Sequence, residues 1–377
     1  MSESAMLRGI RERIDEIDEQ LTGLFERRMS ISLEAARAKA DANLPVLDEA
    51  REQAVVERAV SRTRDDLRGE VTLLMRSIMA LSREYQRPRL FHAEMPLLPP
   101  PRVSPVTNGQ SVVCAFQGVP GAWSEQALIK LFPKAMRSQV EFFEDVFIAV
   151  KEKRADYGVV AIENSTTGAI GETYDLLRKY GCFIVGRTWM DIQQCLLAPP
   201  GVGLSDIREV LSHPEGFRQC GRFLRGRAWD LTACRNTAVA ALEAAEDKSG
   251  RTAAIGSRRA AELNGLNVLA PDIMDSANNR TSFVVIAAEP EYDEKSDLIS
   301  ITFSTEHRAG ALCETLMPFM AQGINLMRIE SRPATPDKYR FFAEINGSIL
   351  NPNVYATLRQ ASAACEYFEV IGCYGNS

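Results

Sequence analysis

Apolar residues recur every three or four positions through the first forty residues, which predicts one long amphipathic helix. The apolar stripe consists of Leu7, Ile10, Ile14, Ile17, Leu21, Leu24, Ile31 and Ala35. Arg28, Ser32 and Lys39 continue the same spacing, so they fall on the face that the helix would bury. Two buried cations are costly unless anionic groups meet them. Either cation alone could form an ion pair with a packed helix, or could extend its charged end to solvent at the edge of the buried face. Arg28 and Lys39 together favour a pocket that binds an anion.

Two shorter helices are predicted after the first. Pro45 ends the first helix, and Asp48 begins the second as its N-cap. A third helix starts at about residue 71. The polar positions on these two helices that attract attention are Arg51, Glu52, Ser82 and Gln86. A buried amide without a partner costs about 1–3 kcal/mol, so a polar ligand inside a small helical bundle explains these positions economically.

Arg11 lies 17 positions before Arg28 on the first helix. That separation is about 25 Å along a straight helix, more than one small molecule can bridge. If Arg11 serves the same kind of site, it must reach a site on a second copy of the chain. The pattern therefore predicts an intertwined dimer.

Residues 5–90 resemble the all-helical class of chorismate mutases. The matching positions are Arg11, Arg28, Lys39, Asp48, Arg51, Glu52, Ser82 and Gln86, with the segment Leu44–Val46 between the first two helices. The resemblance implies a dicarboxylate site shared by two subunits, with chorismate as substrate and prephenate as product. This rearrangement needs no nucleophile, general base, metal or cofactor.

The resemblance also implies roles for the matching residues. Arg11 of a second copy, Arg28 and Arg51 would hold carboxylates. Lys39 and Gln86 would donate hydrogen bonds to the ether oxygen, on which negative charge develops. Glu52 would take the substrate hydroxyl, and Asp48 and Ser82 complete the set.

Strand and helix patterns alternate through residues 111–289, which predicts an open α/β sheet. The strand Tyr157–Ile162 runs into the polar segment Glu163–Ala169, and polar groups beyond a strand's carboxyl end suit a ligand crevice. The same segment also fits an N-cap for the next helix. His213, at the end of another strand, precedes Pro214 and fits a structural turn as well as it fits a catalytic base.

This middle part resembles prephenate dehydratase. The matching segments are Gly118–Ala127, Ala161–Ser165 with Gly168, Ser212–Pro214 with Gln219, Gly256–Ser257 and Asn279–Phe283. The resemblance implies two α/β lobes around a cleft, as in periplasmic-binding proteins, and a reaction in which prephenate loses CO₂ and a hydroxyl group. It makes Thr281 the candidate that assists departure of the hydroxyl. It also places Glu163, Asn164, Ser212 and Gln219 along the cleft.

The key strand departs from the usual pattern Asn-x-Thr-Arg-Phe, because Ser282 takes the place of the arginine. Arg280 precedes it by two residues and so shares its face of an extended strand, about 7 Å away. We expect Arg280 to bind substrate in compensation.

The segment 297–377 reads as strand, helix, two strands, helix and strand, an α+β ferredoxin-like order. It resembles an ACT domain of the phenylalanine-sensing kind. The residues that carry this resemblance are Gly310, Ala311, Leu312, Glu330, Ser331, Arg332 and Pro333. They imply L-phenylalanine as an effector.

Composition narrows the class of protein. The 377 residues carry 44 basic and 50 acidic side chains, a net charge of −6, and no basic tract that would indicate a nucleic acid or membrane partner. Eight cysteines without metal-site spacing, and the lack of an apolar signal region, predict a cytoplasmic protein with reduced thiols. The predicted division is a helical domain at 1–92, a proline-rich linker at 93–110, an α/β domain at 111–289 and the last domain at 297–377.

The order of the three resemblances is that of a bifunctional chorismate mutase–prephenate dehydratase regulated by phenylalanine. A homodimer or a higher homo-oligomer is expected. Two alternatives remain. The middle domain could act on arogenate, which carries an amine where prephenate carries a keto group. Alternatively, Ser282 could mark an inactive dehydratase, which would leave a mutase joined to a phenylalanine sensor.

Overall fold

The computed structural model describes residues 3–42, 48–90, 97–102, 104, 111–276, 278–335 and 338–375. The chain divides into two compact units, which are considered separately. Unit 1 comprises Met1–Pro96, Arg308–Pro318 and Thr357–Cys365, and unit 2 comprises the remainder.

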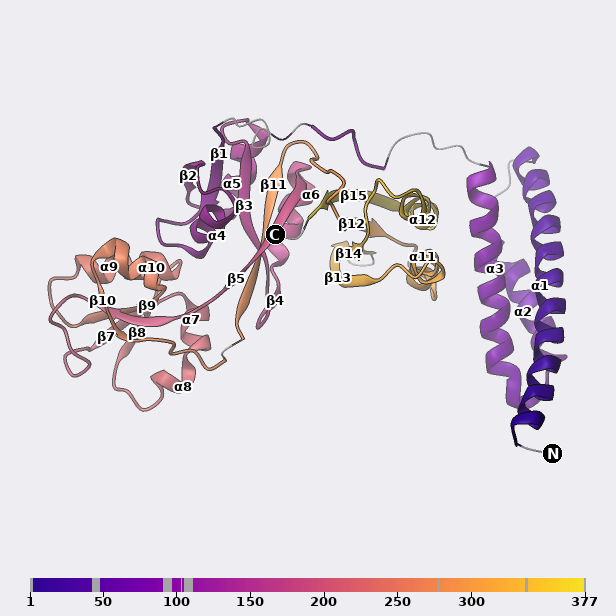
Figure 1. The fold of residues 1–377 in the computed structure, drawn as a ribbon, viewed down its shortest axis with the longest axis horizontal. Helices are drawn as coiled ribbons and strands as arrows, with labels where there is room; N and C mark the ends of the chain where they lie inside the picture. The colour runs from indigo at the N-terminus through magenta and orange to yellow at the C-terminus, as the bar shows by residue number, and fades with distance from the viewer. Residues whose placement is uncertain are drawn as a thin grey trace. The chain divides into compact units, whose positions relative to one another are not determined.

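Three helices dominate unit 1 (Figure 1): α1 (Glu3–Asp41), α2 (Glu49–Val60) and α3 (Arg68–Leu90). They confirm the predicted all-helical N-terminal region. Asp48 caps α2 as expected, because its carboxylate accepts a hydrogen bond of 3.0 Å from the backbone N–H of Arg51. The predicted helix break at Pro45 and the segment Leu44–Val46 lie outside the described residues.

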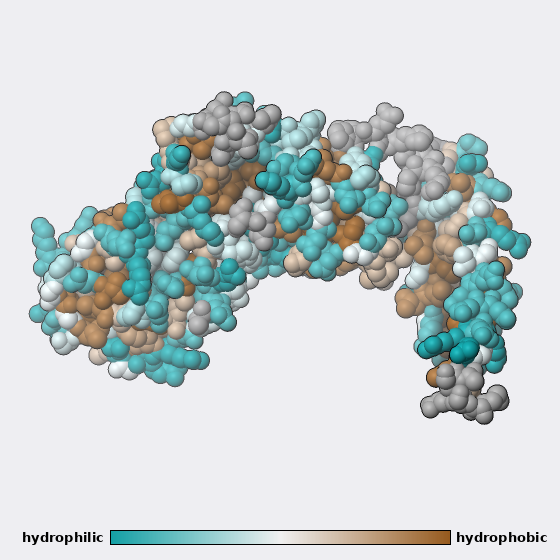
Figure 2. Space-filling view, in the orientation of Figure 1, coloured by the Kyte–Doolittle hydropathy of each residue, from teal (hydrophilic) through white to brown (hydrophobic). Residues whose placement is uncertain are grey.

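The apolar stripe of α1 is not covered within the single chain. Ile14 is 50% exposed and Leu24 is 59% exposed, and the other large members of the stripe from Leu7 to Ile31 are exposed as well. In Figure 2 the hydrophobic surface of these helices gathers chiefly on the side of α3. A helix face of this size normally packs against another element, so the stripe calls for a partner surface.

Unit 2 contains two α/β lobes, as the sequence predicts (Figure 1). In the first lobe the strand order is β5-β11-β3-β1-β2, with a short β4 paired to β3. Its strands are β1 (Val113–Gln117), β2 (Met136–Val140), β3 (Tyr157–Asn164), β4 (Gly168–Ala169), β5 (Phe183–Asp191) and β11 (Arg280–Ala287). Its helices are α4 (Trp123–Leu131), α5 (Phe143–Lys151) and α6 (Gly171–Tyr180). The central strands are buried on both faces, as their continuous apolar runs predict.

The second lobe has the strand order β10-β6-β9-β7-β8. Its strands are β6 (Cys195–Ala198), β7 (Glu209–Ser212), β8 (Asp230–Ala233), β9 (Thr252–Gly256) and β10 (Asn267–Ala270). Its helices are α7 (Pro214–Gln219), α8 (Gly221–Leu224), α9 (Thr237–Glu246) and α10 (Arg258–Asn264). The chain enters this lobe after β5 and returns through β11, so the two lobes share a double connection.

The C-terminal segment follows the predicted element order. Its elements are β12 (Leu298–Ser304), α11 (Ala311–Ala321), β13 (Leu326–Thr335), β14 (Lys338–Asn346), α12 (Pro352–Ala363) and β15 (Tyr367–Tyr374). The strands pair in the order β13-β14-β12-β15, and β15 then pairs with β5 of the first lobe at Gly372 and Ile184. Its sheet is therefore continuous with the sheet of the first lobe.

In the described part of the chain, no helix combines the length and the apolar character that crossing a membrane requires.

Gly372 permits the close approach of β15 to β5, because a Cβ atom there would clash with the carbonyl oxygen of Ile184. We expect Gly372→Ala to lower the free energy of unfolding by about 1–3 kcal/mol, as overpacking does elsewhere. Gly186→Ala is the matched control, because its Cβ would meet the Val285 side chain at an ordinary 3.4 Å. Denaturant unfolding measures both. Equal effects of the two substitutions would contradict this account of the junction.

Candidate functional site

A cavity of about 440 Å³ is lined by residues of both lobes in unit 2. Asn164, Thr281 and Phe283 line it from the first lobe, and His213, Gln219 and Thr237 line it from the second. Of the residues that the sequence placed in the cleft, Asn164, Gln219 and Thr281 are thus brought together. A concave site with a few converging polar groups is the usual form of a small-molecule site.

Asn164 fixes the hydroxyl of Thr281 at this cavity. The two residues face each other across the antiparallel pair β3–β11. The Asn164 amide donates a hydrogen bond of 2.9 Å to the Thr281 Oγ1 and one of 2.7 Å to the Asn279 Oδ1. Because the Thr281 oxygen already accepts a hydrogen bond, its own proton remains available for a ligand.

Gln194 and Trp123 also line the cavity. Trp123 lies within the matched segment Gly118–Ala127 but was not singled out there, and Gln194 lies outside every matched segment. The Gln194 Oε1 and the Trp123 Nε1 are buried and have no hydrogen-bond partner among the described residues. Gln194 is only 3% exposed. Buried polar atoms are normally paired, so an acceptor and a donor left open at a cavity indicate positions that a ligand would fill. Gln194 belongs to no spaced motif, so only the three-dimensional arrangement identifies it.

His213 lies at the cavity as the N-cap of α7. Its Nδ1 accepts a hydrogen bond of 3.1 Å from the Glu215 backbone N–H, so the proton of the neutral ring is on Nε2. Burial lowers the pKa of His213, against the opposing charge of Glu215. The turn role that the sequence suggested is present, and the ring also forms part of the cavity wall.

Three described residues that were expected along the cleft lie outside its lining: Glu163, Ser212 and Arg280. Ser212 is fully buried, and its hydroxyl donates to the Ile255 carbonyl oxygen. Arg280 is half-exposed and forms an ion pair of 2.9 Å with Asp191. Glu163 pairs in the ladder with Ser282, whereas the cavity-lining Asn164 pairs with Thr281. Because side chains alternate along a strand, Glu163 faces away from the cavity.

The helices of unit 1 gather several of the predicted mutase residues. Burial lowers the pKa of Arg28, while the nearby charge of Glu52 opposes this shift. The Arg28 Nη1 is buried and has no partner among the described residues. Gln86 and Ser82 are buried together, and the Gln86 amide donates a hydrogen bond of 2.8 Å to the Ser82 hydroxyl.

The other predicted mutase residues are more accessible. Lys39 is half-buried, whereas Arg11, Asp48 and Arg51 are exposed. Arg11 lies on the same helix as Arg28 and far along it, as the residue spacing requires.

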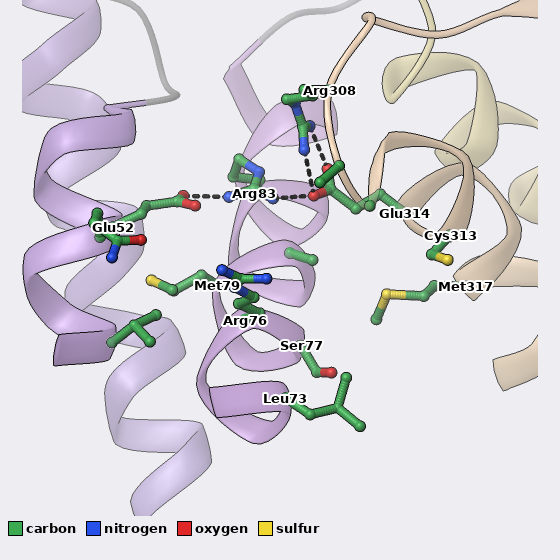
Figure 3. A pocket seen from close by; sticks show the side chains of 15 residues that line it. Glu52, Leu73, Arg76, Ser77, Met79, Arg83, Arg308, Cys313, Glu314 and Met317 are labelled. Carbon is green, nitrogen blue, oxygen red and sulfur yellow. Dashed lines mark hydrogen bonds and ion pairs between the residues drawn. The ribbon is translucent and has the colours of Figure 1, made fainter. Parts of the chain in front are cut away.

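Arg83 is a buried cation of unit 1 that no motif in the sequence indicates. It forms ion pairs with Glu52 and, at 2.7 Å, with Glu314 (Figure 3). These residues line a second cavity, of about 350 Å³. Burial would raise the pKa of Glu314, but the hydrogen bonds from Arg308 and the charge of Arg83 lower it overall. Arg83 therefore fixes the carboxylate of Glu52 from one side.

The predicted effector residues fall into two groups. Gly310 lines the cavity of unit 1, next to the buried Ala311 and the partly buried Leu312. Arg332 and Pro333 line a separate cavity of about 380 Å³ in unit 2, and Arg332 pairs with Asp175 at 3.0 Å.

The remaining two effector residues have simpler surroundings. Glu330 accepts a hydrogen bond of 3.5 Å from Arg328, and Ser331 is exposed.

Two family models match the chain. The model described as chorismate mutase type II matches residues 10–87, and the model described as prephenate dehydratase matches residues 114–291.

Individual relatives agree with these matches. A bifunctional chorismate mutase/prephenate dehydratase of Escherichia coli is 31% identical over 99% of this chain and 97% of its own length. An arogenate dehydratase/prephenate dehydratase of Arabidopsis thaliana is 36% identical over 74% of this chain and 78% of its own length. Among solved structures, a prephenate dehydratase of Arthrobacter aurescens in complex with L-Phe is 29% identical with a TM-score of 0.65, covering 70% of this chain and 90% of that one.

Gln194→Leu tests whether the open amide is a binding group rather than a stabilising one. We expect the substitution to raise the free energy of unfolding by about 1–2 kcal/mol without ligand, because it removes a buried, unpaired carbonyl oxygen. The exposed neighbour Gln193 provides the matched control Gln193→Leu, for which little change is expected. Loss of stability in Gln194→Leu alone, measured by denaturant unfolding, would contradict this interpretation.

Proposed function

Because this chain belongs to the family of bifunctional chorismate mutase/prephenate dehydratases, it is an isomerase and a lyase, and we propose how its residues perform the two reactions. The helices of unit 1 rearrange chorismate to prephenate. The cavity of unit 2 then converts prephenate to phenylpyruvate. The observation that carries the assignment of the second site is the hydrogen bond between Asn164 and Thr281 in a cavity of about 440 Å³.

In the dehydratase reaction the C–C bond to the ring carboxylate breaks and releases CO₂. The electron pair left behind makes the ring aromatic and expels the hydroxyl group from the opposite carbon. The Thr281 hydroxyl donates its hydrogen to that departing oxygen, because its own lone pair is held by Asn164. The open donor of Trp123 is available for a carboxylate. The Gln219 amide nitrogen donates one hydrogen bond of 3.0 Å to Glu215 and can direct its second N–H to the substrate.

The mutase reaction requires charge placed around a compact conformer. Arg28 supplies a half-buried guanidinium with an unpaired nitrogen, which suits a carboxylate. Gln86, held by Ser82, and Lys39 donate toward the ether oxygen. Glu52, fixed by Arg83, accepts the substrate hydroxyl.

A second copy of this chain completes the mutase site. The apolar stripe of α1 is exposed in the single chain, and a matching α1 would cover it. Arg11 is exposed and lies about 25 Å from Arg28 along α1, too far to serve the site of its own chain, so it would reach the site of another subunit. The functional form is therefore at least a homodimer.

The C-terminal segment senses L-phenylalanine as an ACT-type domain. Its βαββαβ order supports this assignment, as does the L-Phe complex of the Arthrobacter relative. The effector residues are those around Gly310–Leu312 and Glu330–Pro333.

Arogenate is a second candidate substrate of the cavity. One relative is an arogenate dehydratase/prephenate dehydratase, and the open Gln194 Oε1 is an acceptor that suits an ammonium group. Comparing turnover of the two acids decides between them.

Thr281→Val should lower the dehydratase kcat by on the order of 10²–10⁴-fold, because it removes the donor while it keeps the side-chain volume. KM should change little. Thr281→Ser keeps the hydroxyl and should retain most of the rate. The mutase activity of the same preparations reports that each variant is folded. A Val variant within about threefold of the parent rate would exclude Thr281 as the donor.

Arg11→Ala and Arg28→Ala test the shared mutase site by complementation. Each variant alone should lose mutase activity, because every site lacks one arginine. When equal amounts are unfolded together and refolded, half of the dimers should contain both variants. Each mixed dimer has one complete site, so the mixture should recover about a quarter of the parent activity. No recovery would show that both arginines act within one chain.

A further inference from the structure

The face of β3 and β11 that points away from the dehydratase cavity carries a buried ionic cluster. Ser282 and Glu163 pair across the two strands, one position from the cavity pair Thr281 and Asn164. The Arg187 guanidinium from the adjacent strand β5 reaches both of them. Its Nε donates a hydrogen bond of 2.7 Å to the Ser282 hydroxyl, and its Nη2 lies 3.3 Å from the Glu163 carboxylate.

Arg187 is also tied to the C-terminal sheet. Its Nη1 donates a hydrogen bond of 2.6 Å to the Glu344 carboxylate on β14. Arg328 on β13 donates a hydrogen bond of 2.8 Å to the same Glu163 oxygen that Arg187 approaches. Arg187 is 6% exposed and Glu344 is 5% exposed, so little solvent screens their interaction.

We propose that Arg187 is a positioning residue for the dehydratase site. From β5 it supplies the guanidinium that the usual pattern Asn-x-Thr-Arg-Phe would place at position 282. This proposal rests on the assignment of the dehydratase reaction. The single guanidinium binds Ser282 of β11 and Glu163 of β3 on the face of the sheet opposite the cavity. It thereby keeps Asn164 and Thr281 in register on the front.

The geometry favours Arg187 over Arg280 for this role. The Arg280 side chain is 54% exposed and pairs with the Asp191 side chain, which is 74% exposed. Such a pair contributes little, whereas a buried guanidinium that meets two carboxylates and a hydroxyl fixes its neighbours. Trp189 contacts both cations, at 4.8 Å from Arg187 and 5.5 Å from Arg280.

An exchange of the two side chains tests the proposal. Arg187→Ser removes the guanidinium, and Ser282→Arg alone adds a second cation where two carboxylates already share Arg187 and Arg328. In the double variant Arg187→Ser/Ser282→Arg, a guanidinium from β11 can occupy the volume that Arg187 vacates. The total charge and volume of the cluster are then conserved.

Each single substitution should lower the dehydratase kcat at least about tenfold with a smaller change in KM, because neither residue touches the substrate. The double variant should recover to within about threefold of the parent, a non-additive result that general destabilisation does not produce. Arg187→Lys should fall between the parent and Arg187→Ser, since it keeps the charge but loses the fork of donors. The control Arg280→Ser should leave kcat unchanged.

Mutase turnover and the denaturant midpoint of each full-length variant report folding separately. A double variant with normal mutase turnover but no recovery of dehydratase kcat would overturn the proposal, as would an effect of Arg280→Ser that exceeds that of Arg187→Ser. If the parent chain does not turn over prephenate, the assigned reaction fails. In that case the denaturant midpoint tests the exchange. The double variant must restore the midpoint of the parent chain, otherwise the proposed placement of the guanidinium is wrong.

Discussion

The antiparallel pairing of β3 with β11 is the constraint on which the dehydratase site depends. One register sets Thr281 opposite Asn164 and Ser282 opposite Glu163. The first pair faces the cavity and the second faces the buried cluster. A slip by one residue would exchange the two faces and remove both the Thr281 hydroxyl and its hydrogen-bond partner Asn164 from the cavity.

The cluster behind these strands also explains how charge is tolerated in the interior. Arg187 and Arg328 are matched by Glu163 and Glu344, and each cation meets a carboxylate within hydrogen-bond distance. Removing one member would leave an uncompensated charge, at a cost of about 3–5 kcal/mol. Because Glu344 and Arg328 belong to the C-terminal strands, the same contacts join those strands to the backs of the catalytic ones.

The sequence predicted the layout of the elements well and the detailed orientation of side chains less well. The helical region, the two α/β lobes and the βαββαβ order follow from periodicity and from the matched motifs. The matched motif placed the adjacent residues Glu163 and Asn164 along the cleft together, but neighbouring side chains on a strand point to opposite faces, so only Asn164 lines the cavity. A register shift between Ser282 and Phe283 interrupts this alternation just before the pair. That irregularity is why Ala161 and Asn164, three positions apart, both line the cavity.

The roles of isolated polar residues also could not be predicted from the sequence. Gln194, Arg83 and Arg187 belong to no spaced motif, and each acquires its meaning from residues distant in the chain. The exposed stripe of α1 shows the opposite case. Its helical spacing was plain in the sequence, but a single chain does not contain the surface that would cover it.

The decisive experiment is to measure phenylpyruvate formation from prephenate by the full-length chain, with and without L-phenylalanine. We expect turnover that L-phenylalanine suppresses, as follows if the cavity with Thr281 is the dehydratase site and the C-terminal segment binds L-phenylalanine as proposed. Conversion of chorismate without any turnover of prephenate would contradict it. That result would show that Ser282, even with Arg187 against it, marks a dehydratase site that has lost its activity.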